Sequence, residues 1–514
     1  MSVLRFSPAH SARPLTVSRA VAEAPARPTR VKIGRRPRIL LVTPELSEST
    51  FLARNGRQSP RVKAGGLADV SALLLDSLAD AGADVHIALP HFRKLFQPGP
   101  GDHARQLHLC QDREFYYRRS VYDGSADSNR RAALAFQRDV IQYVMPKVRP
   151  DLVHCHDWMT GLVPSAARAM GIRSLFTIHN LHDERSTLAE VEDRGIDAAR
   201  FWQHLYYGGY PGSYESCRDG NILSMLASGI HGADRINTVS HSFLHELAVG
   251  GHGAPGPVVD AVQGKLHAQR ACGIINGLPA GISPDRDPHL VQSYDAATHA
   301  AGKRANKLAL QRHLGLELDA EAPILFWPSR LDPVQKGCQL LADILYRLVS
   351  DYWALGLQVV FVADGPFQEY FRNIAGFHDL KHRIAVHGFD ESLSRLGYAA
   401  SDFLLMPSAY EPCGLSQMVG LRYGSLPIVH ATGGLRDTVK PMKWEERTGN
   451  GFAFETHDSN GLRWAIDEAM RFYIRPEAER QRQVSRIMQE SAESFSAAAM
   501  VEEYVRLYRE LLER

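Results

Sequence analysis

The chain has 514 residues, of which 44% are hydrophobic and 23% charged, and its formal net charge is +2. That length exceeds one ordinary hydrophobic core and predicts two or three domains. The nearly balanced charge provides no bulk field for a nucleic acid, and no apolar run approaches the ~18 residues that a membrane span needs. We therefore expect neither a nucleic-acid partner nor a membrane partner.

Cysteine usage and the N-terminal composition indicate the compartment. The six cysteines are scattered and include no Cys-x-x-Cys pair, which is typical of a reducing compartment and argues against disulfides or structural zinc. Residues 1–36 are rich in Arg, Ser, Ala and Pro, with Glu23 as the only acid. We expect a disordered leader on a cytoplasmic protein; the alternative is a cleavable transit peptide that directs the chain to a plastid.

Short apolar runs alternate with helical patterns through the first half of the chain. We expect strands at residues 39–43, 85–90, 152–156, 174–178, 235–239 and 273–275. Helices are expected after the glycine pair at 65–66, over part of 131–147, and near 161–170, 221–233 and the segment after Ser240. Residues 113–122 are interpreted as an edge hairpin and residues 250–256 as a glycine-rich loop.

A second alternating series follows a connector. Its expected strands are residues 324–328, 357–362, 384–387, 403–406 and 426–430, and a last amphipathic helix spans 497–512. Two runs of β-α-β alternation predict an α/β fold with two doubly wound, Rossmann-like parallel sheets. The expected domains are the leader (1–36), a first domain (37–280), a connector (281–322), a second domain (323–490) and a C-terminal helix (491–514). This helix could pack on either domain, and one interpretation is that it crosses back to the first.

Polar clusters follow the ends of most strands, where ligands of such sheets bind. The first is Lys63-Ala64-Gly65-Gly66, whose paired glycines could present N–H groups to an anion at a helix start. The alternative is a flexible turn, and the residue order does not match a Walker A loop.

Three further clusters belong to the first half. His154, His156 and Asp157 end one strand; a metal site is one interpretation, but no third ligand lies nearby, so we favour an Asp157 that accepts hydrogen bonds from sugar hydroxyls. His179 follows the next strand, in either a structural or a ligand-facing role. Asn276 precedes a glycine and fits a simple turn equally well.

The second half supplies cations and one acid. Arg330 and Lys336 lie six residues apart after a strand and suit a diphosphate, although solvated surface charge is the alternative. Glu411 lies between two apolar elements in a loop that also contains Cys413 and Gly414; an ordinary turn is the competing interpretation. The N–H groups of residues 432–434 (Thr432, Gly433 and Gly434) could contact the same phosphates. Two facing domains of this kind predict a deep cleft that binds a nucleotide-sugar.

The ordered motifs resemble those of bacterial glycogen synthases and plant starch synthases, retaining glycosyltransferases of family 5 with the GT-B fold that use ADP-glucose. The resemblance covers about residues 38–514 and rests on KAGGLADV (63–70), HDW (156–158), HN (179–180), TVS (238–240), NG (276–277), SRL (329–331), QKG (335–337), EPCGLSQ (411–417) and TGGL (432–435). Broader glycosyltransferase families usually place a second Glu where this chain has Val419.

The resemblance implies a role for each motif. Asp157, His179 and Asn276 would surround the transferred glucose, and Arg330 and Lys336 would hold the leaving diphosphate. Glu411 would bind glucose hydroxyls beside the reacting carbon, and a phosphate oxygen would take the proton of the attacking hydroxyl. Among the other substrate-binding residues, Lys63, Gly65 and Gly66 would contact the diphosphate or the glucose, and the backbone of Cys413 and Gly414 would support Glu411. Thr432, Gly433 and Gly434 would face the phosphates.

The implied reaction is glucosyl transfer from ADP-glucose to an α-1,4-glucan with retention. We expect no metal and no cofactor, in agreement with the absence of an Asp-x-Asp motif at a strand end. Departures from the family pattern indicate a divergent member: Ala64 replaces Thr or Val, Leu278-Pro279 replaces Val or Ile followed by Asp, and the 46–62 loop is long. The alternatives are a relative that uses UDP-glucose or a small acceptor, and a non-catalytic glucan-binding protein.

Overall fold

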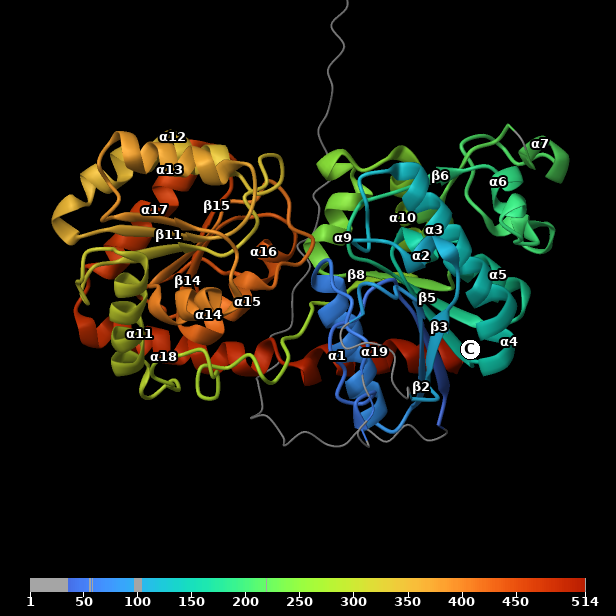
Figure 1. The fold of residues 1–514 in the computed structure, drawn as a ribbon, viewed down its shortest axis with the longest axis horizontal. Coiled ribbons are helices and arrows are strands. Elements are labelled where there is room, and N and C mark those ends of the chain that lie inside the picture. The colour runs from blue at the N-terminus through green and yellow to red at the C-terminus, as the bar shows by residue number, and fades with distance from the viewer. Residues whose placement is uncertain (1–35, 55–56, 58, 97–103, 219, 514) are drawn as a thin grey trace, which may run out of the picture.

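The computed structural model describes residues 36–54, 57, 59–96, 104–218 and 220–513. The leader expected at residues 1–36 lies, apart from Arg36, outside the described residues. The chain forms two α/β lobes that lie side by side, the first in blue and green and the second in yellow and orange (Figure 1).

The first lobe is built on a seven-stranded parallel sheet with the order β3-β2-β1-β4-β5-β8-β9. Its strands are β1 (Arg38–Val42), β2 (Asp84–Pro90), β3 (Leu107–Cys110), β4 (Leu152–His156), β5 (Arg173–Ile178), β8 (Arg235–Thr238) and β9 (Ala271–Gly273). The order reverses between β1 and β4, which makes that point the place where a doubly wound sheet binds ligands.

The second lobe repeats this topology with six parallel strands in the order β12-β11-β10-β13-β14-β15. They are β10 (Ile324–Trp327), β11 (Gln358–Val362), β12 (Ile384–His387), β13 (Phe403–Met406), β14 (Leu426–His430) and β15 (Phe452–Phe454). Here the order reverses between β10 and β13. The predicted class, two doubly wound parallel sheets, is confirmed.

Helices cover both faces of the first sheet and extend the lobe on one side. They are α1 (Gly66–Asp80), α2 (Arg113–Tyr116), α3 (Ala126–Asp139), α4 (Met145–Val148), α5 (Val163–Ala169), α6 (Leu188–Asp193), α7 (Tyr214–Arg218), α8 (Met225–Gly232), α9 (His241–Ala248) and α10 (Gly256–His267). A short antiparallel pair, β6 (Arg185–Ser186) with β7 (Leu223–Ser224), lies beside α6.

The edge hairpin expected at residues 113–122 is wrong. The side chain of Asp112 accepts a hydrogen bond from the Glu114 N–H and starts the helical turn α2, and the rest of the segment is a loop. Local capping by an aspartate therefore determines this segment, in place of strand pairing.

The helices of the second lobe are α11 (His299–Leu314), α12 (Cys338–Asp351), α13 (Phe367–Phe377), α14 (Glu391–Ala400), α15 (Ser416–Tyr423), α16 (Gly433–Thr438), α17 (Ser459–Tyr473) and α18 (Glu477–Ser494). The connector contains the 16-residue helix α11. Its buried Lys303 ammonium donates to the carbonyls of Ala399, Ser401 and Tyr423. These bonds fix the connector against the C-terminal ends of α14 and α15.

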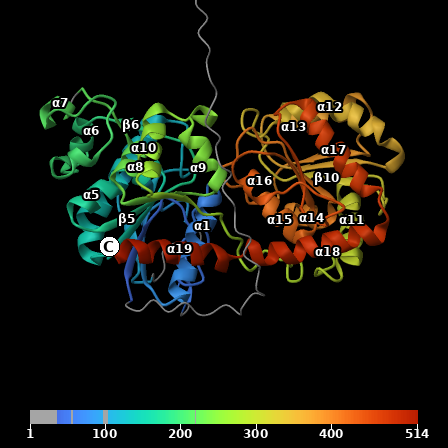
Figure 2. The ribbon, with the colours of Figure 1, turned by 180° about the vertical axis from the view of Figure 1, so that it is seen from behind.

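The C-terminal helix α19 (Ala497–Leu512) follows α18 and runs along the first lobe, so the two helices span both lobes (Figure 2). Met500, Tyr504 and Leu511 of α19 are buried in one apolar core with Ile39 and Leu74 of the first lobe. Where the chain passes between lobes, the Leu278 N–H donates to the Phe495 carbonyl at 2.8 Å. This hydrogen bond joins the two segments by which the chain passes from one lobe to the other.

Within the described part of the chain, no helix is long and apolar enough to cross a bilayer. The cytoplasmic location stays a prediction.

Candidate active site between the two lobes

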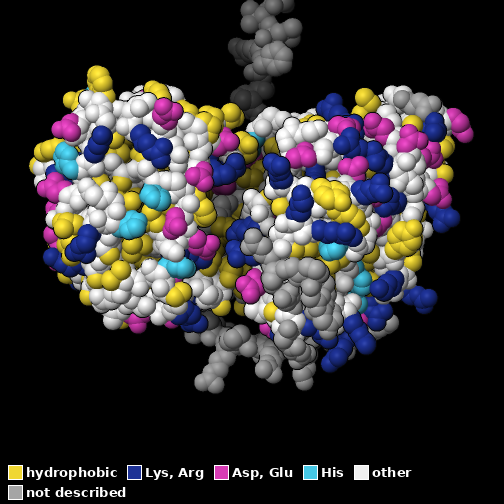
Figure 3. Space-filling view, in the orientation of Figure 1, with side chains coloured by type: hydrophobic (Ala, Val, Ile, Leu, Met, Phe, Trp, Pro, Cys, Tyr) yellow, Lys and Arg dark blue, Asp and Glu magenta, His cyan; other side chains and the backbone are white. Residues whose placement is uncertain are grey.

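The predicted site residues follow the carboxyl ends of strands that flank the two reversal points. Lys63 lies in the loop after β1 and Asp157 directly after β4, on either side of the first reversal. Arg330 follows β10 and Glu411 follows β13, on either side of the second reversal. A furrow separates the lobes in the space-filling view (Figure 3). The topology thus places both sets of residues at ligand-binding edges.

Asp157 is held rigidly at the end of β4. Its backbone has a φ of 59°, a left-handed value that is rare outside glycine and common at functional sites. One carboxylate oxygen accepts the His179 N–H at 2.7 Å and the other accepts from the Asn180 side-chain amide at 2.9 Å. Burial raises the pKa of Asp157 to about 7, against the effect of these hydrogen bonds. Asp157 therefore fixes the loop that contains His179.

Three neutral histidines, His154, His156 and His179, lie next to one another and support that loop. His179 Nε2 lies 3.0 Å from His156 Nδ1, and the rings of His156 and His154 lie 4.2 Å apart. Burial lowers the pKa of His179 to about 3 and holds the pKa values of His154 and His156 well below their usual range. His179 is therefore uncharged at neutral pH and can exchange hydrogen bonds with a sugar hydroxyl.

The tautomer of His154 follows from its partners. The Thr177 hydroxyl donates to Asn237 Oδ1 at 2.6 Å, so it must accept from His154 Nε2, also at 2.6 Å. His154 Nδ1 then accepts from the Tyr508 hydroxyl of α19 at 2.7 Å, and Asn237 donates to the Tyr504 hydroxyl at 3.0 Å. The C-terminal helix thus completes the polar network beneath the site.

These pKa shifts predict a pH-dependent stability. The three histidines bind protons in the unfolded chain below about pH 6.5 but stay neutral in the fold, so the free energy of unfolding rises with pH up to that value. Asp157 acts in the opposite direction between its unfolded pKa and about 7, because the folded carboxyl keeps its proton longer. Each group changes stability by up to about 1.4 kcal/mol per pH unit.

The three histidines outweigh the single aspartate, so we expect urea unfolding midpoints to rise from pH 4.5 to 6.5. Replacement of Asp157 by Asn should make that rise steeper, since the opposing group is removed. A flat profile, or a shallower one in the Asp157→Asn variant, would contradict the assignment.

A buried ion pair marks the second lobe. Lys336 Nζ lies 2.5 Å from Glu411 Oε2, and both residues are less than a tenth exposed. The Ser408 hydroxyl donates to the same Glu411 oxygen at 3.1 Å. Arg330 is different: its side chain is 71% exposed, with Asp332 at 3.9 Å and Gln335 at 3.4 Å as weak partners. Arg330 is therefore free to reorient toward an anion, whereas Lys336 is already bound to Glu411.

Close backbone contacts hold the Glu411 loop. The Gly434 N–H donates to the Glu411 carbonyl at 2.9 Å. A Cβ at Gly433 would lie 2.1 Å from that carbonyl oxygen, and one at Gly434 would lie 2.1 Å from the Cys413 carbonyl oxygen. Gly414 has a φ of 73° and lies against Gln417. These glycines serve the packing of two loops on one another, a role that sequence inspection missed.

Unpartnered polar atoms lie where the lobes meet. Asn276 Oδ1 and Thr432 Oγ1 are buried and have no hydrogen-bond partner among the described residues. Buried polar atoms normally have a partner, so these two atoms indicate a ligand or water. Cys413 lies against the Asn276 backbone, and burial raises its pKa to about 12, which keeps it a neutral thiol.

Helix α9 of the first lobe contacts α16 of the second, and the two face each other at the centre of the molecule (Figure 1). Ser242 donates to the carboxylate of Asp437 through its N–H at 2.9 Å and its hydroxyl at 2.6 Å. Glu246 accepts the Gly433 N–H at 2.8 Å and contacts His252 at 2.7 Å. In this arrangement the Glu246 carboxylate already accepts the Gly433 N–H, which we had assigned to a phosphate.

The glycine loop after β1 is also partly engaged. The Lys63 ammonium pairs with Asp69 at 2.7 Å and stays 41% exposed. The Gly65 N–H donates to Glu45, while Gly66 abuts Leu415 of the second lobe. Sequence reasoning missed Glu45 and Glu246. Glu45 lies just past a predicted strand, so its position could have marked it as a candidate site residue. Glu246 is one of several polar residues on a helix, and nothing in the sequence distinguishes it from them.

No cluster of three His, Cys, Asp or Glu side chains that could hold a metal ion occurs in the described segments. The site offers charged, hydroxyl-binding and backbone N–H groups from both lobes.

Two family models match this chain. Residues 38–256 match the model described as the starch synthase catalytic domain, and residues 315–486 match that of glycosyl transferases group 1. The glycogen synthase of Exiguobacterium sibiricum is 34% identical over 495 residues, which cover 88% of this chain and 96% of the relative. That of Geobacillus thermodenitrificans is 31% identical and covers 81% of this chain and 89% of the relative.

Solved structures match as well. The catalytic domain of starch synthase IV from Arabidopsis thaliana, bound to ADP and acarbose, is 26% identical with a TM-score of 0.76, covering 93% of this chain and 100% of that one. Sucrose-phosphate synthase from Thermosynechococcus elongatus, 18% identical with a TM-score of 0.56 and coverage of 93% and 100%, shares the fold. The GT-B architecture of these glycosyltransferases is thus the architecture of this chain.

Proposed function

We propose, since this chain belongs to the family of glycogen and starch synthases, that its glucosyl donor is ADP-glucose and its acceptor the non-reducing end of an α-1,4-glucan. It is a glycosyltransferase that takes glucose from a nucleotide-sugar to a glucan. The choice of ADP-glucose is supported by the ADP in the related starch synthase structure.

One observation carries the proposed site: a buried ammonium–carboxylate pair, Lys336 with Glu411, at the reversal point of the second sheet. Burying two charges is expensive unless they pair, and one carboxylate uses only part of the donor capacity of an ammonium. The two remaining Lys336 protons and the free fork of Arg330 suit a diphosphate.

The proposed chemistry follows from where charge develops. Cleavage of the anomeric C–O bond leaves negative charge on the nucleotide diphosphate, which Arg330 and Lys336 would stabilise; losing one such donor typically costs about 10²–10³ in rate. Positive charge develops on the sugar, next to Glu411. A neutral His179 adds no repelling charge there. A phosphate oxygen would accept the proton of the attacking hydroxyl, and the configuration would be retained.

The other predicted residues would hold and orient the donor. Asp157 would act through the His179–Asn180 loop that it fixes. The unpartnered oxygens of Asn276 and Thr432 would accept from donor hydroxyls. We assign donor contacts also to Lys63 and Gly66, and support of the Glu411 loop to Cys413, Gly414, Gly433 and Gly434. Donor binding at Gly433 would displace Glu246 from its N–H.

The experiment measures nucleotide release from ADP-glucose and UDP-glucose, each with and without glycogen. We expect glycogen-dependent release that is faster with ADP-glucose. Faster release with UDP-glucose would contradict the donor assignment, and absence of glycogen-dependent release with both donors would contradict the whole proposal.

A further inference from the structure

The N–H groups of the Lys63–Gly66 loop in the first lobe already bind a carboxylate of the protein itself, that of Glu45. Glu45 Oε2 accepts the Ala64 N–H at 2.7 Å and the Gly65 N–H at 2.8 Å. Glu45 is only 2% exposed. Consecutive N–H groups that converge on one oxygen form a typical anion-binding concavity. A carboxylate therefore fills the place that the sequence suggested for a phosphate.

The other oxygen of Glu45 is held as well. Oε1 accepts from the Tyr122 hydroxyl at 2.8 Å. The Glu45 N–H contacts the Thr43 hydroxyl, which in turn lies 3.1 Å from Ser71 of α1. Glu45 is thus bonded to three parts of the first lobe, and its position is fixed before any ligand arrives.

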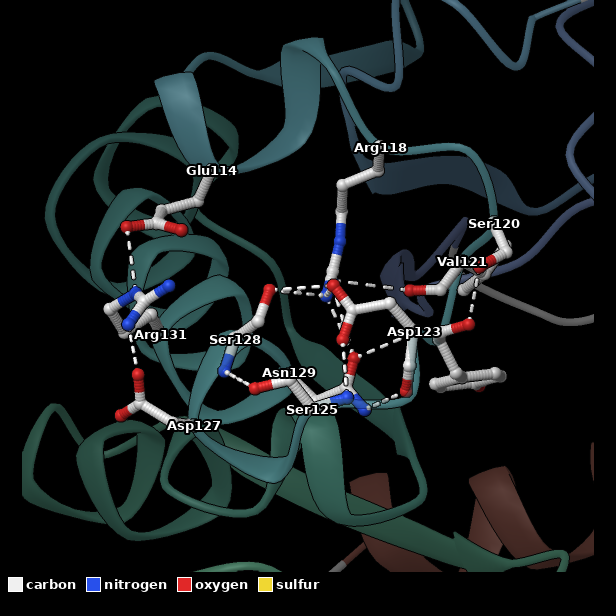
Figure 4. A network of polar contacts seen from close by, with 11 residues as sticks. Glu114, Arg118, Ser120, Val121, Asp123, Ser125, Asp127, Ser128, Asn129 and Arg131 are labelled. Carbon is white, nitrogen blue, oxygen red and sulfur yellow. Dashed lines mark hydrogen bonds and ion pairs between the residues drawn. The ribbon is translucent and has the colours of Figure 1, made fainter.

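Tyr122 comes from a loop that is itself fixed by a buried arginine (Figure 4). Arg118 Nη2 donates to Asn129 Oδ1 at 2.7 Å, to Asp123 Oδ2 at 3.1 Å and to Ser128 at 3.2 Å. The N–H of Asp123 donates to Asn129 Oδ1 at 3.0 Å. These bonds hold Asp123 of the loop against Ser128 and Asn129 of α3, and with it the neighbouring Tyr122.

We propose that Glu45 is a positioning residue, which locks the Lys63–Gly66 loop so that the Lys63 ammonium and the Gly66 N–H point to the donor. Among the described residues the Gly66 N–H, the first of helix α1, makes no hydrogen bond. Gly66 also faces Leu415 of the second lobe, 3.4 Å from where its Cβ would be. The inference rests on the proposed donor-binding role of Lys63 and Gly66.

Two substitutions separate positioning from a role of the charge itself. A glutamine at this place can turn its oxygen to the Ala64 and Gly65 N–H groups and its amide to the Tyr122 oxygen, because a hydroxyl also accepts. The geometry is then kept without charge. An alanine leaves both N–H groups without their acceptor and frees the loop.

We expect the Glu45→Gln variant to keep kcat/KM for the nucleotide-sugar within about threefold of native, and the Glu45→Ala variant to lose about 100-fold, since a small misplacement of donor-binding groups has that effect. The loss should lie in the KM for the donor, with the KM for glycogen unchanged. Hydrogen exchange of the Ala64 and Gly65 N–H groups should be slow in the native protein and in Glu45→Gln, and fast in Glu45→Ala.

Equal losses in the two variants would overturn the inference, because the charge would then be what matters. So would unchanged exchange and an unchanged donor KM in Glu45→Ala. The assays use whichever donor the native chain turns over, so a failure of the ADP-glucose assignment, seen in the native protein alone, is distinguishable from a failure of the role given to Glu45.

Discussion

Replacement of Glu411 by Gln is expected to lower kcat at least about 100-fold, because it removes both a hydroxyl-binding carboxylate beside the reacting carbon and the buried partner of Lys336. Breaking a buried pair on one side also costs about 3–5 kcal/mol of stability, since the remaining charge has no counter-ion. Steady-state rates at saturating donor and glycogen, with urea unfolding of each variant, measure both effects.

A double variant separates the two consequences. Lys336→Met alone should also lose activity and stability, because Glu411 then stays charged and buried. With Lys336→Met and Glu411→Gln combined, no unpaired charge remains, so we expect most of the stability to return while the activity stays lost. If the activity returned together with the stability, the pair would have a structural role only.

Replacement of Gly434 by Ala is expected to be the second most damaging change. The new Cβ would lie 2.1 Å from the Cys413 carbonyl oxygen and 2.4 Å from the Cys413 Cα. Backbone at that distance must move, and it belongs to the loop that carries Glu411. Overpacking of this kind costs about 1–3 kcal/mol, and a displacement of the site by about 1 Å reduces the rate by about 10²-fold. Thermal unfolding and kcat/KM for the donor measure the two effects.

Gly376→Ala is the matched control in the same lobe. This glycine lies in α13, and its Cβ would meet only the far end of Lys381 at 3.8 Å. Alanine should leave activity unchanged and stabilise the helix by up to about 1 kcal/mol. Near-native activity in Gly434→Ala would mean that the contact between the two loops does not position Glu411.

Most strands, and the polar loops that follow them, could be predicted because buried strands require runs of apolar residues that are visible in the sequence. Short runs of β-branched residues and leucine predicted β4, β12, β13 and β14 with the observed ends. The amphipathic spacing of apolar residues likewise predicted α19 with the observed ends. Two strands without a long apolar run were missed: His108 interrupts β3, and β15 has only three residues.

Partners across long chain distances could not be predicted. Lys336 was assigned to a diphosphate alone, and nothing in its neighbourhood along the chain indicates that Glu411, 75 residues later, lies 2.5 Å away. The same holds for Glu45, whose partner Tyr122 comes from a segment that we took for a hairpin. These contacts arise from tertiary packing. A sequence motif shows that a charged residue is present but does not show which distant residue it contacts.

The site itself is tested most directly by the structure of this chain with ADP bound. We expect the diphosphate to lie between the lobes, within about 3 Å of the Arg330 guanidinium and the Lys336 ammonium, with Glu246 withdrawn from the Gly433 N–H. A diphosphate bound away from Arg330 and Lys336, with the Lys336–Glu411 pair outside the cleft that holds it, would contradict the account.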